Sequence, residues 1–141
     1  MRLTVARDYI EAFLKIRTKD GQLVPFRLNA PQKRLYAAAH EQWAAGKPVR
    51  IIILKARQMG FSTLTEALIF YLAATRFHTE GMVVAHTEDA TAKLFQMTQR
   101  FYENLPPPLQ PQRRASNAQE LVFDRPPRTK GRRPGLGSSI R

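Results

Sequence analysis

The stretch that most constrains the fold of this chain is residues 49–63, which read VRIIILKARQMGFST. Residues 49–54 hold five aliphatic side chains and one arginine, so an extended segment would be apolar on both faces. Such a run predicts a strand in the middle of a parallel sheet, where both faces are covered. A short loop, residues 55–61, leads from it into a predicted helix over residues 62–76, with apolar residues on one side.

A second strand and helix follow in the same order. Residues 82–85 are apolar and predict a strand, and residues 88–104 have the periodicity of an amphipathic helix. Strand, helix, strand, helix predicts an α/β fold, a parallel sheet flanked by helices of the P-loop NTPase type, but incomplete. The other predicted elements are helices within residues 3–17 and after Asn29, an extended segment over residues 23–28, and short strands at residues 121–123 and 138–141.

Composition excludes several classes of protein. With 141 residues and 43% hydrophobic residues, the chain is long and apolar enough to build a core. No apolar run approaches the roughly 18 residues of a membrane span, and charges near the first residue argue against an export signal. The absence of cysteine excludes disulfides, thiolate metal sites and cysteine nucleophiles, and fits a reducing compartment.

Charge points to a polyanionic partner. The formal net charge is +12, which suits DNA, RNA or nucleotide phosphates. We divide the chain into an N-terminal segment, residues 1–48, and a core, residues 49–141, in which residues 125–137 are predicted to form an exposed basic loop. A solvated basic tail is the alternative to a binding surface. The basic residues beyond residue 112 are Arg113, Arg114, Arg125, Arg128, Lys130, Arg132, Arg133 and Arg141, against only Glu120 and Asp124.

The loop between the first strand and its helix has the position of a phosphate-binding loop. A helix N-terminus offers unpaired backbone N–H groups and a positive dipole end to an anion. The usual pattern is G-x-x-x-x-G-K-[ST]. This chain keeps the second glycine as Gly60 and the hydroxyl as Ser62, but has Lys55 in place of the first glycine and Phe61 in place of the lysine.

The cations of this loop could replace the missing lysine. Lys55 has a flexible stem that could swing over bound phosphates, and Arg57 could stabilise charge on a transferred phosphoryl group. Ser62 could bind Mg²⁺ through its hydroxyl. The alternatives are that Lys55 and Arg57 are ordinary loop charges and that Ser62 only caps the helix. We expect Thr63 to be structural.

With these residues in view, the sequence resembles the large terminase subunits of tailed phages, the motors that package DNA. A loop of the form K-x-R-Q-x-G-[FYK]-S/T after a strand resembles their variant Walker A motif. Three other blocks resemble the family in the same order, so the likeness spans residues 24–141. They are FRLNAPQ at residues 26–32, VVAH at residues 83–86 with the helix and proline-rich turn that follow, and LVFD at residues 121–124 paired with GSSI at residues 137–140.

The resemblance implies ATP and Mg²⁺ as cofactors, with Gln32 on adenine, Arg57 as a catalytic residue and Ser62 on the metal. Gln32 as an ordinary exposed helix residue is the alternative. The implied partners are double-stranded DNA, the phage portal, the small terminase subunit and further copies of the intact parent, in the cytoplasm of a bacterial host and not at a membrane. The implied nucleotide-binding residues are Gln32, Lys55, Arg57, Gln58, Met59, Gly60, Phe61, Ser62 and Thr63.

The departures from the family pattern are as informative as the resemblance. The Walker B strand, four apolar residues followed by Asp-Glu, is missing, and so is the nuclease domain. Asp124 follows an apolar run but precedes Arg125, so we reject it as Walker B. We therefore interpret the sequence as a fragment, a truncated gene product or a prophage remnant. The alternatives are a helicase-like nucleic-acid translocase fragment and a non-enzymatic basic nucleic-acid-binding remnant.

This chain by itself is predicted to show no appreciable ATP hydrolysis, although its parent would be an ATPase. Hydrolysis needs the phosphates held, the metal held and a water molecule oriented, and the sequence supplies no candidate for the last. Steady-state phosphate release by purified protein with Mg²⁺ and ATP, with and without DNA, checks this. Robust turnover that disappears in Lys55→Ala would contradict it.

Overall fold

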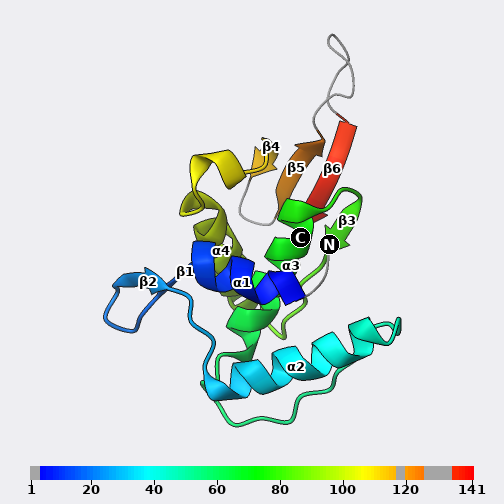
Figure 1. Ribbon diagram of the computed structural model, residues 1–141. Coiled ribbons are helices and arrows are strands. Elements are labelled where there is room, and N and C mark those ends of the chain that lie inside the picture. The colour runs from blue at the N-terminus through cyan, green and yellow to red at the C-terminus, as the bar shows by residue number, and fades with distance from the viewer. Residues whose placement is uncertain (1–3, 117–119, 126–134) are drawn as a thin grey trace.

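The computed structural model describes residues 4–116, 120–125 and 135–141 and contains both helices and strands (Figure 1). The predicted helix within residues 3–17 is shorter than expected, because a strand replaces its last residues. The elements are α1 Thr4–Phe13, β1 Lys15–Arg17, β2 Leu23–Pro25, α2 Ala30–Ala44, α3 Phe61–Thr75, β3 Thr79–Gly81, α4 Glu88–Glu103, a 3-10 turn Pro107–Leu109, β4 Arg113–Ser116, β5 Leu121–Arg125 and β6 Gly135–Ile140.

The strands form one mixed sheet and one small hairpin. In the sheet the order is β3-β6-β5-β4, and only β3 and β6 run parallel. The pairs β5–β6 and β4–β5 are antiparallel, and β1 pairs antiparallel with β2 in the hairpin. The described residues therefore form a mixed α/β fold of four helices and a four-stranded sheet, in which no P-loop fold is identified.

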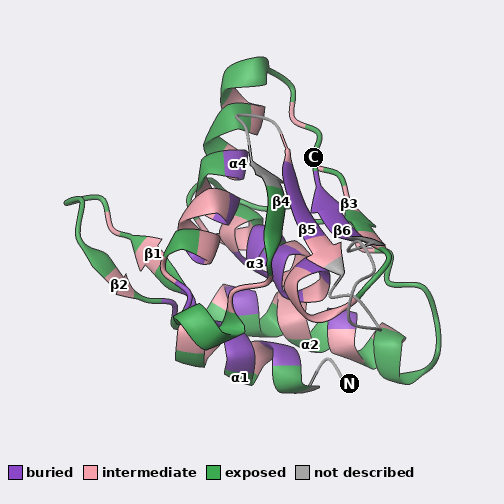
Figure 2. Ribbon diagram, turned by 90° about the horizontal axis from the view of Figure 1, so that it is seen from above, coloured by how far each residue is buried: buried purple, intermediate pink, exposed green. Residues whose placement is uncertain are grey.

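Helix α3 lies at the centre of the core. It packs against α1, α2 and α4 and against β3 and β6, and Figure 2 shows buried residues concentrated on the elements that surround it. Leu64, Phe70 and Tyr71 of this helix are at most 1% exposed. The ring of Phe70 lies 5.9 Å from that of Phe101 on α4 and 6.3 Å from that of Phe123 on β5. Aromatic packing thus joins the helices to the sheet.

Local sequence signals explain where the helices begin. Asn29 caps α2 as predicted, because its side chain accepts a hydrogen bond from Gln32 N while the Gln32 side chain accepts one from Asn29 N. Thr87 caps α4 by accepting a hydrogen bond from Ala90 N. The predicted boundaries of α3 and α4 are each confirmed to within one residue.

The predicted parallel sheet is wrong in its most important strand. Residues 49–54 do not belong to the sheet but run as an extended segment beside α2 (Figure 1). The parallel pair is instead β3 with β6, which are joined by backbone hydrogen bonds. Residues 49–54 pair with no strand in the described chain. Apolar character predicts that a segment favours a strand, but a strand forms only where a neighbouring backbone offers hydrogen bonds.

The other predicted strands are closer to the structure. The second parallel strand is β3 rather than residues 82–85, although Val83 N extends its ladder by donating to Arg141 O at 2.8 Å. The strands predicted at residues 121–123 and 138–141 are confirmed as β5 and β6. Most of the predicted basic loop, residues 126–134, lies outside the described residues. No helix among the described residues is long and apolar enough to cross a membrane.

A carboxyl group is buried between α3 and α4. Glu66 is 2% exposed, and its Oε2 accepts a 2.8 Å hydrogen bond from the hydroxyl of Thr98, which is fully buried. Burial raises the pKa of Glu66 because it penalises the charged form, and the hydrogen bond from Thr98 offsets only part of this rise. Folding therefore shifts the titration of Glu66 toward its protonated form.

Glu66 is predicted to make the protein less stable as the pH rises. Because its pKa is higher in the folded than in the unfolded state, the carboxyl's contribution is fully present below the unfolded pKa and is lost as the pH passes the folded pKa. Glu66→Gln, which keeps an acceptor for Thr98, should raise the free energy of unfolding at alkaline pH and lose this advantage in acid. Urea denaturation across pH measures it. An equal effect of Glu103→Gln, at an exposed site on α4, would contradict the assignment.

Candidate functional site

The loop before α3 has a backbone that turns sharply at two positions. Gln58 has φ 63° and Gly60 has φ 75°, both in the left-handed region. Gly60 is the N-cap of α3, and no side chain supplies a capping hydrogen bond there. A side chain at position 60 would be strained by the backbone and would also meet Gln32, because an added Cβ would lie 2.6 Å from Gln32 Nε2.

Two side chains from the start of α2 hold this loop. Gln32 Nε2 donates to Gly60 O at 2.7 Å, and Asn29 Nδ2 donates to Met59 O at 3.3 Å. Gln32 is 4% exposed, and its Oε1 is also engaged, by Asn29 N at 2.9 Å. The alternative of an ordinary exposed Gln32 is therefore wrong. Its contact with adenine stays a prediction, and the structure gives it a further role in fixing the loop.

The structure adds cations that the sequence analysis missed. Lys19, at the turn of the β1–β2 hairpin, donates from Nζ to Gln58 Oε1 at 3.0 Å. Arg17 and Arg100 line a small hollow of about 90 Å³ that also includes Thr63, in the first turn of α3. These side chains come from the β1–β2 hairpin and from α4. No sequence motif announces them, because only the packing of the hairpin and α4 around α3 brings them near the loop.

The first turn of α3 suits an anion. It contains no acidic residue, and its leading N–H groups have no side-chain acceptor at the N-cap. Ser62 is the second residue of the helix, not its cap, so the alternative of a purely capping role is wrong. Its hydroxyl is exposed and makes no hydrogen bond within residues 4–116, 120–125 and 135–141. Thr63 is half-buried and its hydroxyl lies 3.8 Å from Met97 Sδ, which fits the expected structural role.

Lys55 and Arg57 lie on the exposed approach to this turn. Both side chains are exposed, and neither makes a hydrogen bond or an ion pair within the described part of the chain. With Lys19 they make the loop rich in positive charge. The structure thus brings Gln32, residues 58–60 and the start of α3 into contact, and it leaves Lys55 and Arg57 free to reach an anion.

An apolar groove of about 480 Å³ lies beside the loop. Residues 51–54 form one wall, and the first half of α2 contributes Pro31 and Leu35 to the other. Met59 and Phe61 close the end next to the loop, and Arg34 is the charged residue among the lining side chains. The predicted site therefore has an apolar surface on one side of its cationic loop.

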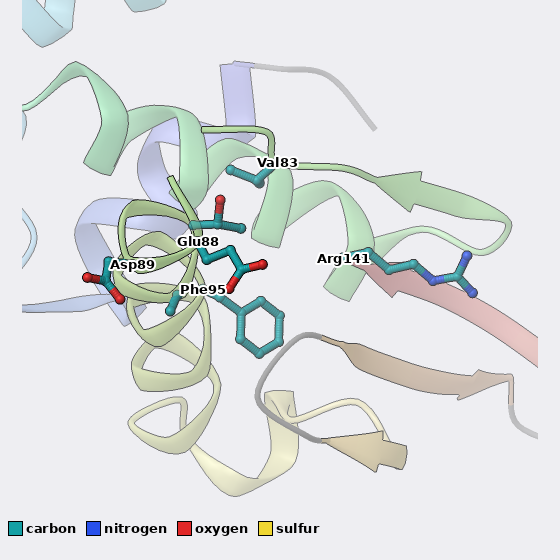
Figure 3. Close-up of a pocket in the computed structure, with 7 residues that line it drawn as sticks. Val83, Glu88, Asp89, Phe95 and Arg141 are labelled. Carbon is teal, nitrogen blue, oxygen red and sulfur yellow. The ribbon is translucent and has the colours of Figure 1, made fainter. Parts of the chain in front are cut away.

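A second hollow, of about 380 Å³, lies away from the loop and contains none of the predicted site residues (Figure 3). Glu88 and Asp89 from the start of α4 and Phe95 from its second turn line one side, and Val83 and Arg141 line the other. Arg141 extends away from these carboxylates, and its Nε lies 2.7 Å from Glu120 Oε1. Among the described residues no group of three or more His, Asp or Glu could hold a metal ion.

No protein-family model matches the chain, and no curated protein matches it. A function is therefore inferred from the residues of the loop, their hydrogen bonds and their charges.

Gly60→Ala is predicted to destabilise the protein more than Gly46→Ala. Both glycines have positive φ, 75° and 69°, so both variants carry a backbone cost of about 1 kcal/mol. At Gly46 an added Cβ would meet nothing within 4 Å, whereas at Gly60 it would press on Gln32. We expect a further loss of about 1 kcal/mol or more for Gly60→Ala in urea denaturation.

The double variant Gln32→Ala/Gly60→Ala identifies the cause of that extra loss. If the alanine at position 60 presses on the amide of Gln32, removing the amide relieves the clash. The double variant should then lose less free energy of unfolding than the sum of the losses of the two single variants. Equal losses for Gly60→Ala and Gly46→Ala would show that the close approach of Gln32 to Gly60 has no energetic consequence.

Proposed function

We propose that this chain is the nucleotide-binding front part of an ATP-driven motor that packages double-stranded DNA, similar to the large terminase subunits of tailed phages. In this proposal ATP with Mg²⁺ binds at the loop before α3. Lys55 and Arg57 contact phosphate oxygens, Ser62 binds the metal and Arg57 also stabilises charge on the transferred phosphoryl group. The portal, the small subunit and further copies of the parent are the partners that the family resemblance suggests.

The observation that carries this proposal is the contact between two of the four resembling blocks. Residues 26–32 and the loop are separated in the sequence by most of α2 and the segment that follows it, yet Gln32 and Asn29 bind the carbonyl groups of Gly60 and Met59. A glutamine that recognises a base must lie close to the loop that binds the phosphates of the same nucleotide. These hydrogen bonds bring the start of α2 and the loop into contact, which supports the proposal.

Charge and local geometry support the same site. The first turn of α3 has unpaired N–H groups and no acidic residue, and Lys55, Arg57 and Lys19 add positive charge on and beside the loop that precedes it. The exposed hydroxyl of Ser62 faces no competing hydrogen-bond partner in the described chain. The net charge of +12 suits a DNA partner and would make DNA binding weaken with salt.

Lys55→Ala is predicted to weaken the binding of Mg²⁺–ATP by about tenfold or more, because a charge-assisted hydrogen bond is worth about 1.5–3 kcal/mol. Isothermal titration calorimetry measures the affinity. Lys47→Ala is the matched control, since Lys47 is exposed at the other end of the same segment and outside the loop.

Two results would contradict the proposal. The first is an equal loss of affinity for Mg²⁺–ATP in Lys47→Ala and Lys55→Ala, which would mean that the affinity depends only on the overall charge of the chain. The second is a parent chain that binds DNA but does not bind nucleotide. This result would favour the non-enzymatic nucleic-acid-binding remnant.

A further inference from the structure

The aliphatic segment 49–54 is unusually exposed. Ile52 and Leu54 have relative exposures of 101% and 103%, higher than any other large apolar side chain in the described residues. Ile51 between Arg50 and Ile52 is half-buried, and Ile53 is 37% exposed. Exposure thus alternates along the segment, as it does in a β-strand with one face against the protein and one in water. The segment follows the outer side of α2, away from the sheet (Figure 1).

The backbone of this segment is held at one end and open along the rest. Gln42 on α2 accepts a hydrogen bond from Arg50 N at 2.8 Å and donates one to Arg50 O at 3.3 Å. The N–H and C=O groups of residues 51–54 make no hydrogen bond within the described chain. An extended, apolar and unpaired backbone is a template on which another strand can pair.

We propose that two copies of this chain pair through residues 49–55 in an antiparallel ribbon centred on Ile52. In this register Ile52 faces Ile52 of the second copy and Ile51 faces Ile53. Arg50 faces Leu54, and Lys55 faces Val49. Each cation therefore lies opposite an aliphatic side chain, and no two like charges are directly opposed. Of the antiparallel registers that keep the faces of the segment, this one pairs the longest stretch, which is why the occupant is a second copy.

Other registers are less favourable. A slip of one residue in one direction sets Arg50 opposite Lys55, which is repulsive. A slip of one residue in the other direction pairs Ile51 with Ile52, so that a half-buried and a fully exposed residue share a face. A slip of two residues keeps the faces but shortens the paired stretch. Because each copy carries a net charge of +12, added salt should strengthen the dimer.

The absence of cysteine from the chain allows a direct test by cross-linking. Ile52→Cys should form a disulfide-linked dimer under mild oxidation, because directly opposed residues lie within disulfide reach. Leu54→Cys alone should not, since its own copy lies four residues away, roughly 13 Å along the ribbon. A mixture of Leu54→Cys with Arg50→Cys should cross-link. Val84→Cys, at an exposed apolar residue elsewhere, is the control for random collision.

Sedimentation of the unmodified chain provides the second measurement. We expect a monomer–dimer equilibrium that tightens with salt and that Ile52→Lys weakens by about tenfold or more, since two lysines would then oppose each other. Ile52 is fully exposed in the single chain, so the substitution leaves the fold intact. Equal cross-linking of every cysteine variant would overturn the proposal. A chain that stays monomeric and does not cross-link through Ile52→Cys would also overturn it. The same holds if a strand of another protein, rather than a second copy, pairs with residues 51–54.

Discussion

The burial of α3 is the constraint on which the rest of the structure depends. The α-helices α1, α2 and α4 and two strands of the sheet pack against this helix, and its Phe70 meets aromatic rings from α4 and β5. The interior of a protein is close-packed, so the position of α3 fixes the elements around it. The price of this arrangement is one buried carboxyl, Glu66, whose raised pKa makes the helix interface sensitive to pH.

The same helix positions the loop. Its N-terminus is exposed although its middle is buried, so the first-turn N–H groups remain available while the helix is held rigidly. The capping box of α2 is then used twice: Asn29 and Gln32 begin their own helix and also bind the carbonyl groups of Met59 and Gly60. A capping signal that is local in the sequence becomes a long-range contact that fixes the loop.

The segment before the loop, residues 49–54, is held much less firmly than the loop itself. It has the composition of a buried strand, yet Ile52 and Leu54 are fully exposed. Gln42 and the groove along α2 keep it extended without satisfying the backbone of residues 51–54. The loop proposed to bind ATP therefore follows a segment whose backbone is unpaired within one chain. A dimer through this segment would also restrain the backbone that leads to Lys55.

Sequence alone determined the helices, the cap at Asn29 and the position of Gly60, because these depend on neighbours within a few residues. It also identified the loop and its cations by residue type and order. Only the tertiary structure decided the sheet, in which β6 rather than residues 49–54 pairs with β3, since strand pairing depends on which backbones meet. It alone joined Lys19 to Gln58 and Gln32 to Gly60, because contacts between residues far apart in the chain are created by the packing around α3.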